Sequence, residues 1–136
     1  MKKLAVGERA TFEVDARRMF NESGIQVESG AVYRLAVSQQ IEAWDDASVH
    51  SSPRHGWSMP WSLIEPLVRL RARASNVPMY ALVGAVDEDP STYFHALAEQ
   101  DWTPSRNGQF TCFANDWARK YDNNKGRLLL EMTRVA

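Results

Sequence analysis

The chain of 136 residues contains a single cysteine, Cys112, so it can form neither an internal disulfide bond nor a zinc site built from several cysteines. Cys112 shares one side of a predicted strand with Phe110 and Ala114, which favours an inert core thiol over a nucleophile. No apolar run approaches the ~18–20 residues of a membrane-spanning helix. The basic start, Met1–Glu8, lacks the apolar segment of a signal peptide, so we expect a cytoplasmic protein.

Motifs of the common catalytic and nucleotide-binding sites are also missing. The sequence has no HExxH, GxSxG, GxGxxG or P-loop pattern. His50 and His55 share one loop, but nothing in the sequence supplies the further ligands that zinc requires. The formal net charge of −1 gives no overall bias toward nucleic acid or an anionic membrane. These absences favour a non-enzymatic protein with neither a nucleic-acid partner nor membrane insertion.

Short segments with the pattern of β-strands recur along the chain. Thr11–Ala16 alternates strictly between polar and apolar residues, as a half-buried strand does. Met79–Val86 is continuously apolar and is predicted to be the most buried strand. Gly, Pro, Asn and Asp residues punctuate the segments, and helical periodicity is almost absent. The pattern predicts one all-β domain, residues 1–136, built as an antiparallel β-sandwich or barrel. The further predicted strands are 25–28, 32–38, 92–97, 109–114 and 127–135.

The middle of the chain is predicted to be less regular. Residues 39–46 are interpreted as a loop, and 47–60 as the longest irregular stretch, of the kind that often carries function. Trp57 and Trp61 lie in or beside it and are the tryptophans expected to be exposed. Residues 62–73 are predicted to contain one or two helical turns, because a proline interrupts any longer helix.

A polar loop between two predicted strands, Asn115–Gly126, is the strongest candidate site. It carries four side-chain oxygen donors, which are Asp116, Asp122, Asn123 and Asn124. Calcium binds six to eight oxygens from carboxylates, amides, carbonyls and water. Asn and Asp also fill loops simply because they stabilise turns. From the residues alone, a calcium site and a plain turn both remain open.

The loop resembles the calcium loop of the PA-IL-like (LecA-type) bacterial galactophilic lectins. The specific part is the spacing of Asn115-Asp116, Tyr121, Asn123-Asn124 and Gly126. Scattered similarity extends over most of the chain from about residue 11. The resemblance implies a galactose-binding-domain-like jelly-roll sandwich that binds calcium and, through it, a sugar. The outer matching segments are Ser23–Gly30, Tyr80–Val86, Thr103–Gly108 and Phe110–Asp116.

Transferred by position, the resemblance makes Asp116, Asn123 and Asn124 the side-chain calcium ligands and Lys120 a ligand through its backbone carbonyl. A further carbonyl is expected from residues 43–45. The calcium in these lectins also binds two sugar hydroxyls directly, which replace water as oxygen ligands. The facing loop would then contact the sugar, and we name its candidate residues as Trp44, His55 and Trp57.

This chain also departs from the family pattern. The family's sugar site has a histidine followed closely by a glutamine, and the loop 47–60 has His50 and His55 but no glutamine. Asp122 adds charge beside the expected calcium, and Trp117 adds bulk. The main hypothesis is a calcium-dependent carbohydrate-binding protein, with a galactoside as one candidate ligand. The alternative is a structural or protein-interaction sandwich that has lost sugar binding and assembles as a homo-oligomer. Non-classical export stays open, because the resembling lectins lack signal peptides.

Overall fold

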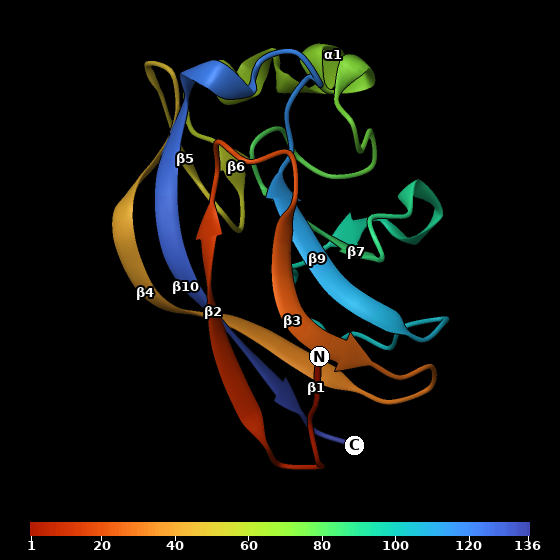
Figure 1. The fold of residues 1–136 in the computed structure, drawn as a ribbon. Helices are drawn as coiled ribbons and strands as arrows, with labels where there is room; N and C mark the ends of the chain where they lie inside the picture. The colour runs from red at the N-terminus through yellow and green to blue at the C-terminus, as the bar shows by residue number, and fades with distance from the viewer.

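A computed structural model describes all 136 residues and folds them into two five-stranded β-sheets that pack against each other (Figure 1). One sheet has the order β1-β3-β9-β7-β8 and the other β2-β10-β4-β5-β6. All pairings are antiparallel except that of β1 with β3. The predicted all-β sandwich is confirmed. The strands are β1 (Lys2–Lys3), β2 (Arg9–Asp15), β3 (Asn21–Val27), β4 (Tyr33–Asp46), β5 (Val49–Ser52), β6 (Gly56–Trp57), β7 (Leu82–Val86), β8 (Phe94–His95), β9 (Gly108–Ala114) and β10 (Asn124–Arg134).

Helical structure is limited to short segments. They are the 3-10 turns η1 (Trp61–Leu63), η2 (Arg69–Arg71), η3 (Pro90–Thr92) and η4 (Tyr121–Asn123), and the helix α1 (Glu65–Val68). No helix in the structure is long and apolar enough to cross a bilayer.

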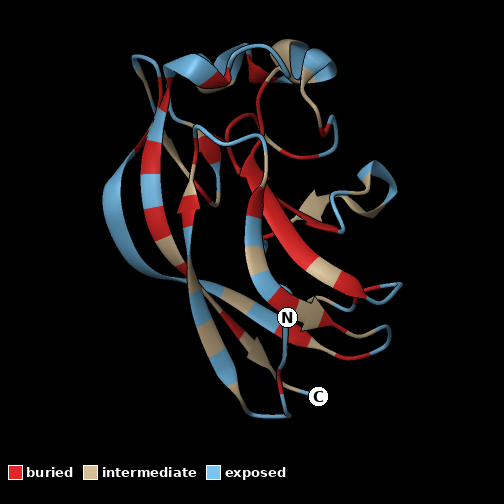
Figure 2. Cartoon of the chain, in the orientation of Figure 1, coloured by how far each residue is buried: buried red, intermediate tan, exposed pale blue.

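The core lies between the sheets and follows the alternation of the strands. Along β10, Leu128, Leu130 and Met132 point inward while their neighbours are more exposed, as Figure 2 shows. Strand β7 is buried at every position, as its apolar run predicted. Its two faces pack on different clusters: Leu82 joins the main core, and Val83 joins a second cluster beneath the loop that precedes β7. Burial on both faces explains why this strand shows no alternation.

Two segments differ from the sequence prediction. Residues 39–46 were expected to be a loop, yet they extend β4, because β10 pairs with β4 as far as Asp46. Residues 47–60 were expected to be irregular, yet they contain the hairpin formed by β5 and β6. Pro66 occupies the first turn of α1, where its missing N–H costs nothing, so it starts that helix instead of interrupting one.

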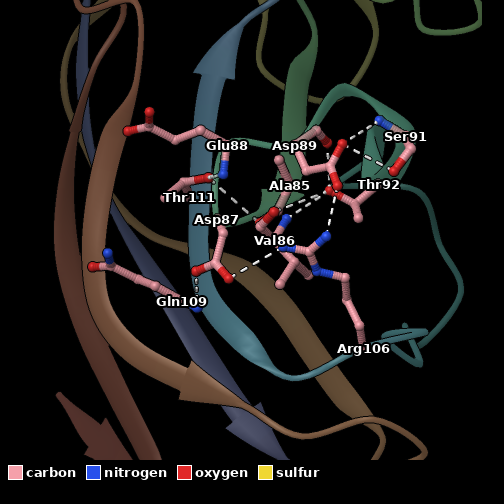
Figure 3. A network of polar contacts seen from close by, with 10 residues as sticks. All are labelled: Ala85, Val86, Asp87, Glu88, Asp89, Ser91, Thr92, Arg106, Gln109 and Thr111. Carbon is pink, nitrogen blue, oxygen red and sulfur yellow. Dashed lines mark hydrogen bonds and ion pairs between the residues drawn. The ribbon is translucent and has the colours of Figure 1, made fainter.

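A polar network closes the turn after β7, at the end of the sandwich where β9 starts (Figure 3). Arg106 contacts Asp89 at 2.6 Å and Asp87 at 3.3 Å. Asp87 also accepts a hydrogen bond from the backbone N–H of Gln109 at 2.8 Å. Glycine is required at position 108, because a Cβ there would lie 2.4 Å from the Asp87 carboxylate. The carboxylates of Asp87 and Asp89 both have partners within the chain, so the network is structural.

At the opposite end of β9, the side chain of Asn115 holds the loop that precedes β7. It accepts a hydrogen bond from the backbone N–H of Ala74 at 3.0 Å. Its amide nitrogen donates to the carbonyls of Ala74 at 2.8 Å and Val77 at 2.7 Å. The side chain is fully buried. Asn115 therefore substitutes for a missing strand neighbour and fixes the loop against the sheet.

We predict that Asn115→Ala lowers the free energy of unfolding by about 2–4 kcal/mol, because it leaves buried backbone groups without partners. Asn76→Ala is the matched control, since Asn76 is exposed in the same loop and should change stability by less than about 0.5 kcal/mol. Urea unfolding followed by tryptophan fluorescence measures both. Equal effects of the two variants would contradict the role assigned to Asn115.

Candidate functional site

Three polar side chains meet where β9, β4 and β10 come together at one end of the sandwich. Asp116 follows the end of β9, Asp46 ends β4 and Asn124 begins β10. The antiparallel register places Asp46 directly opposite Asn124. All three are buried, although they are polar. Buried carboxylates and amides are costly unless they are satisfied, so their arrangement requires a physical explanation.

The hydrogen bonds of this cluster are incomplete. One carboxylate oxygen of Asp116 accepts the backbone N–H of Trp117 at 2.7 Å, and the other, Oδ2, has no partner. The amide nitrogen of Asn124 donates to the carbonyl of Ala16 at 3.0 Å, which leaves Oδ1 without a partner. These two oxygens are the only buried side-chain polar atoms in the chain that lack a partner. Both are acceptors, so what they lack is a donor or a cation.

The electrostatics of the cluster also show an excess of negative charge. Burial, and then the charge of Asp46, raises the pKa of Asp116 to about 7. Burial likewise raises the pKa of Asp46, opposed by a hydrogen bond from Trp57 Nε1 at 3.0 Å. The side chains of Asn124 and Lys120 lower the pKa of Asp116 to a lesser extent. Lys120 forms no ion pair with either carboxylate.

An open pocket of about 180 Å³ lies above these carboxylates. Its polar lining consists of two carboxylates, one amide and one lysine, and its walls include two indole rings and aliphatic side chains. Such a mixture suits a ligand that has both hydroxyl groups and apolar faces. The lining residues are Asp46, Trp57, Val68, Met79, Asp116, Trp117, Lys120 and Asn123.

Most of the residues predicted from the sequence meet at this pocket. Asp116, Lys120, Asn123 and Trp57 line it. Asn124 lies behind them, paired with Asp46 and near enough to Asp116 to influence its pKa. The structure thus brings the loop residues and one residue of the facing hairpin into a single site.

Two predicted sugar contacts lie elsewhere. Trp44 was predicted to contact the sugar, but it is only 3% exposed. Its Nε1 donates a hydrogen bond to the carbonyl of Tyr80 at 2.7 Å, so its ring belongs to the core. Gly126 is needed beneath that ring, because a Cβ there would lie 2.6 Å from Trp44. His55 is exposed in the turn between β5 and β6 and does not line the pocket.

Asp46 is the residue of the site that the sequence prediction missed. The prediction treated its neighbourhood as a loop that supplies one carbonyl. The available signal was two acidic residues after Trp44, at the end of a segment compatible with a strand. That signal gains meaning only from the β4–β10 register, which brings Asp46 to the candidate loop.

The donor set fits a hard cation such as calcium. It contains the carboxylates of Asp46 and Asp116 and the amide oxygen of Asn124, and Asn123 lines the same pocket. No group of three or more His, Cys, Asp or Glu side chains converges in the structure. Calcium needs no such group, because amides, backbone carbonyls, waters and ligand hydroxyls complete its shell.

Fold and pocket together define a two-sheet β-sandwich with an oxygen-rich loop site at one end. No family model and no curated protein sequence matches the chain. Among solved structures, it is similar to the N-terminal domain of EclA, a PllA-like lectin, with a TM-score of 0.62 and 16% sequence identity. The match covers 91% of this chain and 94% of that one. The lectin resemblance inferred from the sequence is thus confirmed at the level of the fold.

We predict that Asp116→Asn stabilises the metal-free protein above pH 7. Folded Asp116 holds a proton up to about pH 7, whereas an unperturbed aspartate loses it near 3.8. Between these values the folded state binds more protons, so the free energy of unfolding of the wild type falls as pH rises, and then levels off. The stability of the variant does not decrease in this way, because asparagine does not ionise. The variant should therefore be about 1–3 kcal/mol more stable than the wild type at pH 8.

Urea unfolding in EDTA at pH 5 and pH 8 tests the prediction. Asp122→Asn serves as the control, because it removes an exposed carboxylate of the same loop and should not reproduce the stabilisation expected for Asp116→Asn. A wild type whose stability does not fall between these pH values would refute the electrostatic account.

Proposed function

We propose that this chain is a calcium-dependent, non-enzymatic carbohydrate-binding protein. One observation carries the proposal: the two unpartnered buried oxygens, on Asp116 and Asn124, lie in one cluster beside an open pocket. Natural proteins rarely leave buried acceptors unsatisfied, and those that remain require a specific explanation. A calcium ion would satisfy both oxygens and offset the charge of the two carboxylates.

The residues of the pocket divide between the ion and the ligand. Asp116 and Asn124 are the ligands best supported by burial, and Asp46 and Asn123 reach the same pocket. Bound calcium supplies open positions at which two neighbouring sugar hydroxyls can replace water. The rings of Trp57 and Trp117 flank the pocket and offer apolar surface to the carbon face of a sugar.

A galactoside is one candidate for the sugar. The hairpin of β5 and β6 carries histidines but no glutamine to complete the expected galactose contacts. His55 does not reach the pocket, and Trp57 does. A sugar-contacting role therefore falls to the aromatic residues, which select for shape and apolar faces more than for one hydroxyl pattern.

We expect calcium to bind the EDTA-treated wild type with a measurable heat in isothermal titration calorimetry. Asp116→Asn should weaken the affinity at least ~30-fold, since it removes the charge of a buried ligand (~2 kcal/mol). Asp46→Asn should also weaken it, by about tenfold.

The exposed Asp122→Asn is the matched control and should change calcium affinity by less than about threefold. A wild type that shows no calcium heat would overturn the metal part of the proposal. So would an Asp116→Asn variant that binds calcium as tightly as the wild type.

We also expect wild-type protein to bind a subset of glycans on an array in calcium, and to lose that binding in EDTA. Trp57→Ala should reduce the glycan signal about tenfold, and Trp57→Phe should retain most of it, because the ring persists. Trp61→Ala is the control, since Trp61 does not line the pocket. Glycan silence combined with a chelator-insensitive oligomer would favour the alternative, an interaction sandwich without sugar binding.

A further inference from the structure

The segment from Met59 to Arg71 has its polarity reversed relative to an ordinary surface segment. Its acidic residue, Glu65, is 5% exposed and accepts hydrogen bonds from Arg69 and from the backbone N–H of Met79, the latter at 2.6 Å. The large apolar side chains point to the solvent instead. We call these six residues the apolar cap: Met59 (66% exposed), Trp61 (46%), Leu63 (71%), Ile64 (47%), Leu67 (75%) and Leu70 (74%).

The cap is not an ordinary scatter of exposed apolar residues. The chain has eleven exposed large hydrophobic residues, and six of them fall within the twelve positions from Met59 to Leu70. The other five are distributed over the N-terminus, the β2–β3 turn and β4. Single exposed apolar residues need no explanation, but a contiguous group marks a surface that is covered in use.

Cations outnumber acidic residues beside the cap, and three of them form no ion pair; the exposed Asp122 is the acidic residue of the same loop. Glu65 is neutralised by Arg69, so it adds no net charge to the surface. Arg71 lies over the ring of Trp117 at 5.8 Å and forms no ion pair. Arg119 and Lys120 follow Trp117 closely in the sequence and are exposed. Neither of them forms an ion pair.

The cap is also held firmly in place at the end of the sandwich that carries the pocket. Trp117 Nε1 donates to the carbonyl of Val68 at 3.1 Å, and both residues line the pocket. Figure 1 shows α1 at the same end as β5 and β6, and Figure 2 shows much of its surface exposed. The buried Glu65 and the partly buried Trp117 thus anchor a segment whose outer side chains point to the solvent.

We propose that the apolar cap docks on an anionic phospholipid surface, with its aliphatic and indole side chains in the interface and Arg71, Arg119 and Lys120 at the headgroups. Apolar side chains flanked by unpaired cations are the features that bind such surfaces without crossing the bilayer. A second copy of the chain is disfavoured as the occupant, because a twofold contact would bring the same cations together. Docking in this way turns the neighbouring pocket toward the membrane.

Co-sedimentation with vesicles tests the proposal. The full chain is mixed with phosphatidylcholine vesicles containing roughly 30% phosphatidylserine, or with phosphatidylcholine alone, in EGTA so that the candidate calcium site plays no part. We expect binding to the anionic vesicles and weaker binding to the neutral ones. Leu63→Ser combined with Leu67→Ser should lower the partition coefficient at least ~10-fold, and Arg71→Gln should lower it ~fivefold.

The matched control is Val37→Ser combined with Ile41→Ser, which removes two exposed apolar residues from β4 and should leave partitioning unchanged. Thermal unfolding and the calcium titration, repeated on the cap variant, should match the wild type, so loss of docking stays separate from failure of the pocket. Absence of binding to anionic vesicles would overturn the proposal. A wild-type dimer that the cap variant converts to a monomer would overturn it in favour of self-association.

Discussion

Strand β10 pairs with β2 on one edge and β4 on the other, and its register sets most of the structure. The same register that buries Leu128 and Leu130 in the core places Asn124 opposite Asp46 at the end of the sheet. A slip by one residue would exchange the core face of β10 with its outer face and separate this polar pair. The core and the candidate site therefore depend on one set of strand pairings.

The candidate site concentrates negative charge where the surrounding structure is rigid. Asn115 fixes the loop on one side, and the hydroxyl of Tyr121 donates to the carbonyl of Ala114 at 2.5 Å on the other. Tyr80 completes the support by donating to the carbonyl of Lys125 at 2.8 Å. Within this frame Asp116 stays buried, and burial disfavours its charged form. Local conflict of this kind is typical of functional sites.

The two functional proposals concern different chemistry at one end of the molecule. The pocket offers oxygen ligands and indole walls, whereas the apolar cap offers aliphatic surface with unpaired cations. Val68 and Trp117 join the two, since they line the pocket and support the segment that carries the cap. At the opposite end, Arg106 pairs with the carboxylates of Asp87 and Asp89. The two ends of the sandwich therefore differ, because the buried carboxylates that line the pocket form no ion pair with a cationic side chain.

The strands were predictable where they alternate or are continuously apolar, as in β2 and β7, because local periodicity reflects which face is buried. The oxygen donors of Asn115–Gly126 were predictable for a similar reason, since their spacing within one loop is a local property. The predicted loop at 39–46, by contrast, is the end of β4, and its exposed middle carries no alternation to reveal it.

The rest was decided by contacts between distant segments. Asp46 belongs to the site because β10 pairs with β4. Trp44 does not, because its indole is buried and donates a hydrogen bond to the carbonyl of Tyr80. The apolar cap could not be predicted from the sequence either, because the inward position of Glu65 depends on its hydrogen bond with the backbone of Met79. The sequence by itself determined the sandwich and the ligand types of the loop. Tertiary structure alone decided which side chains meet there, because burial and register arise from pairings across the whole chain.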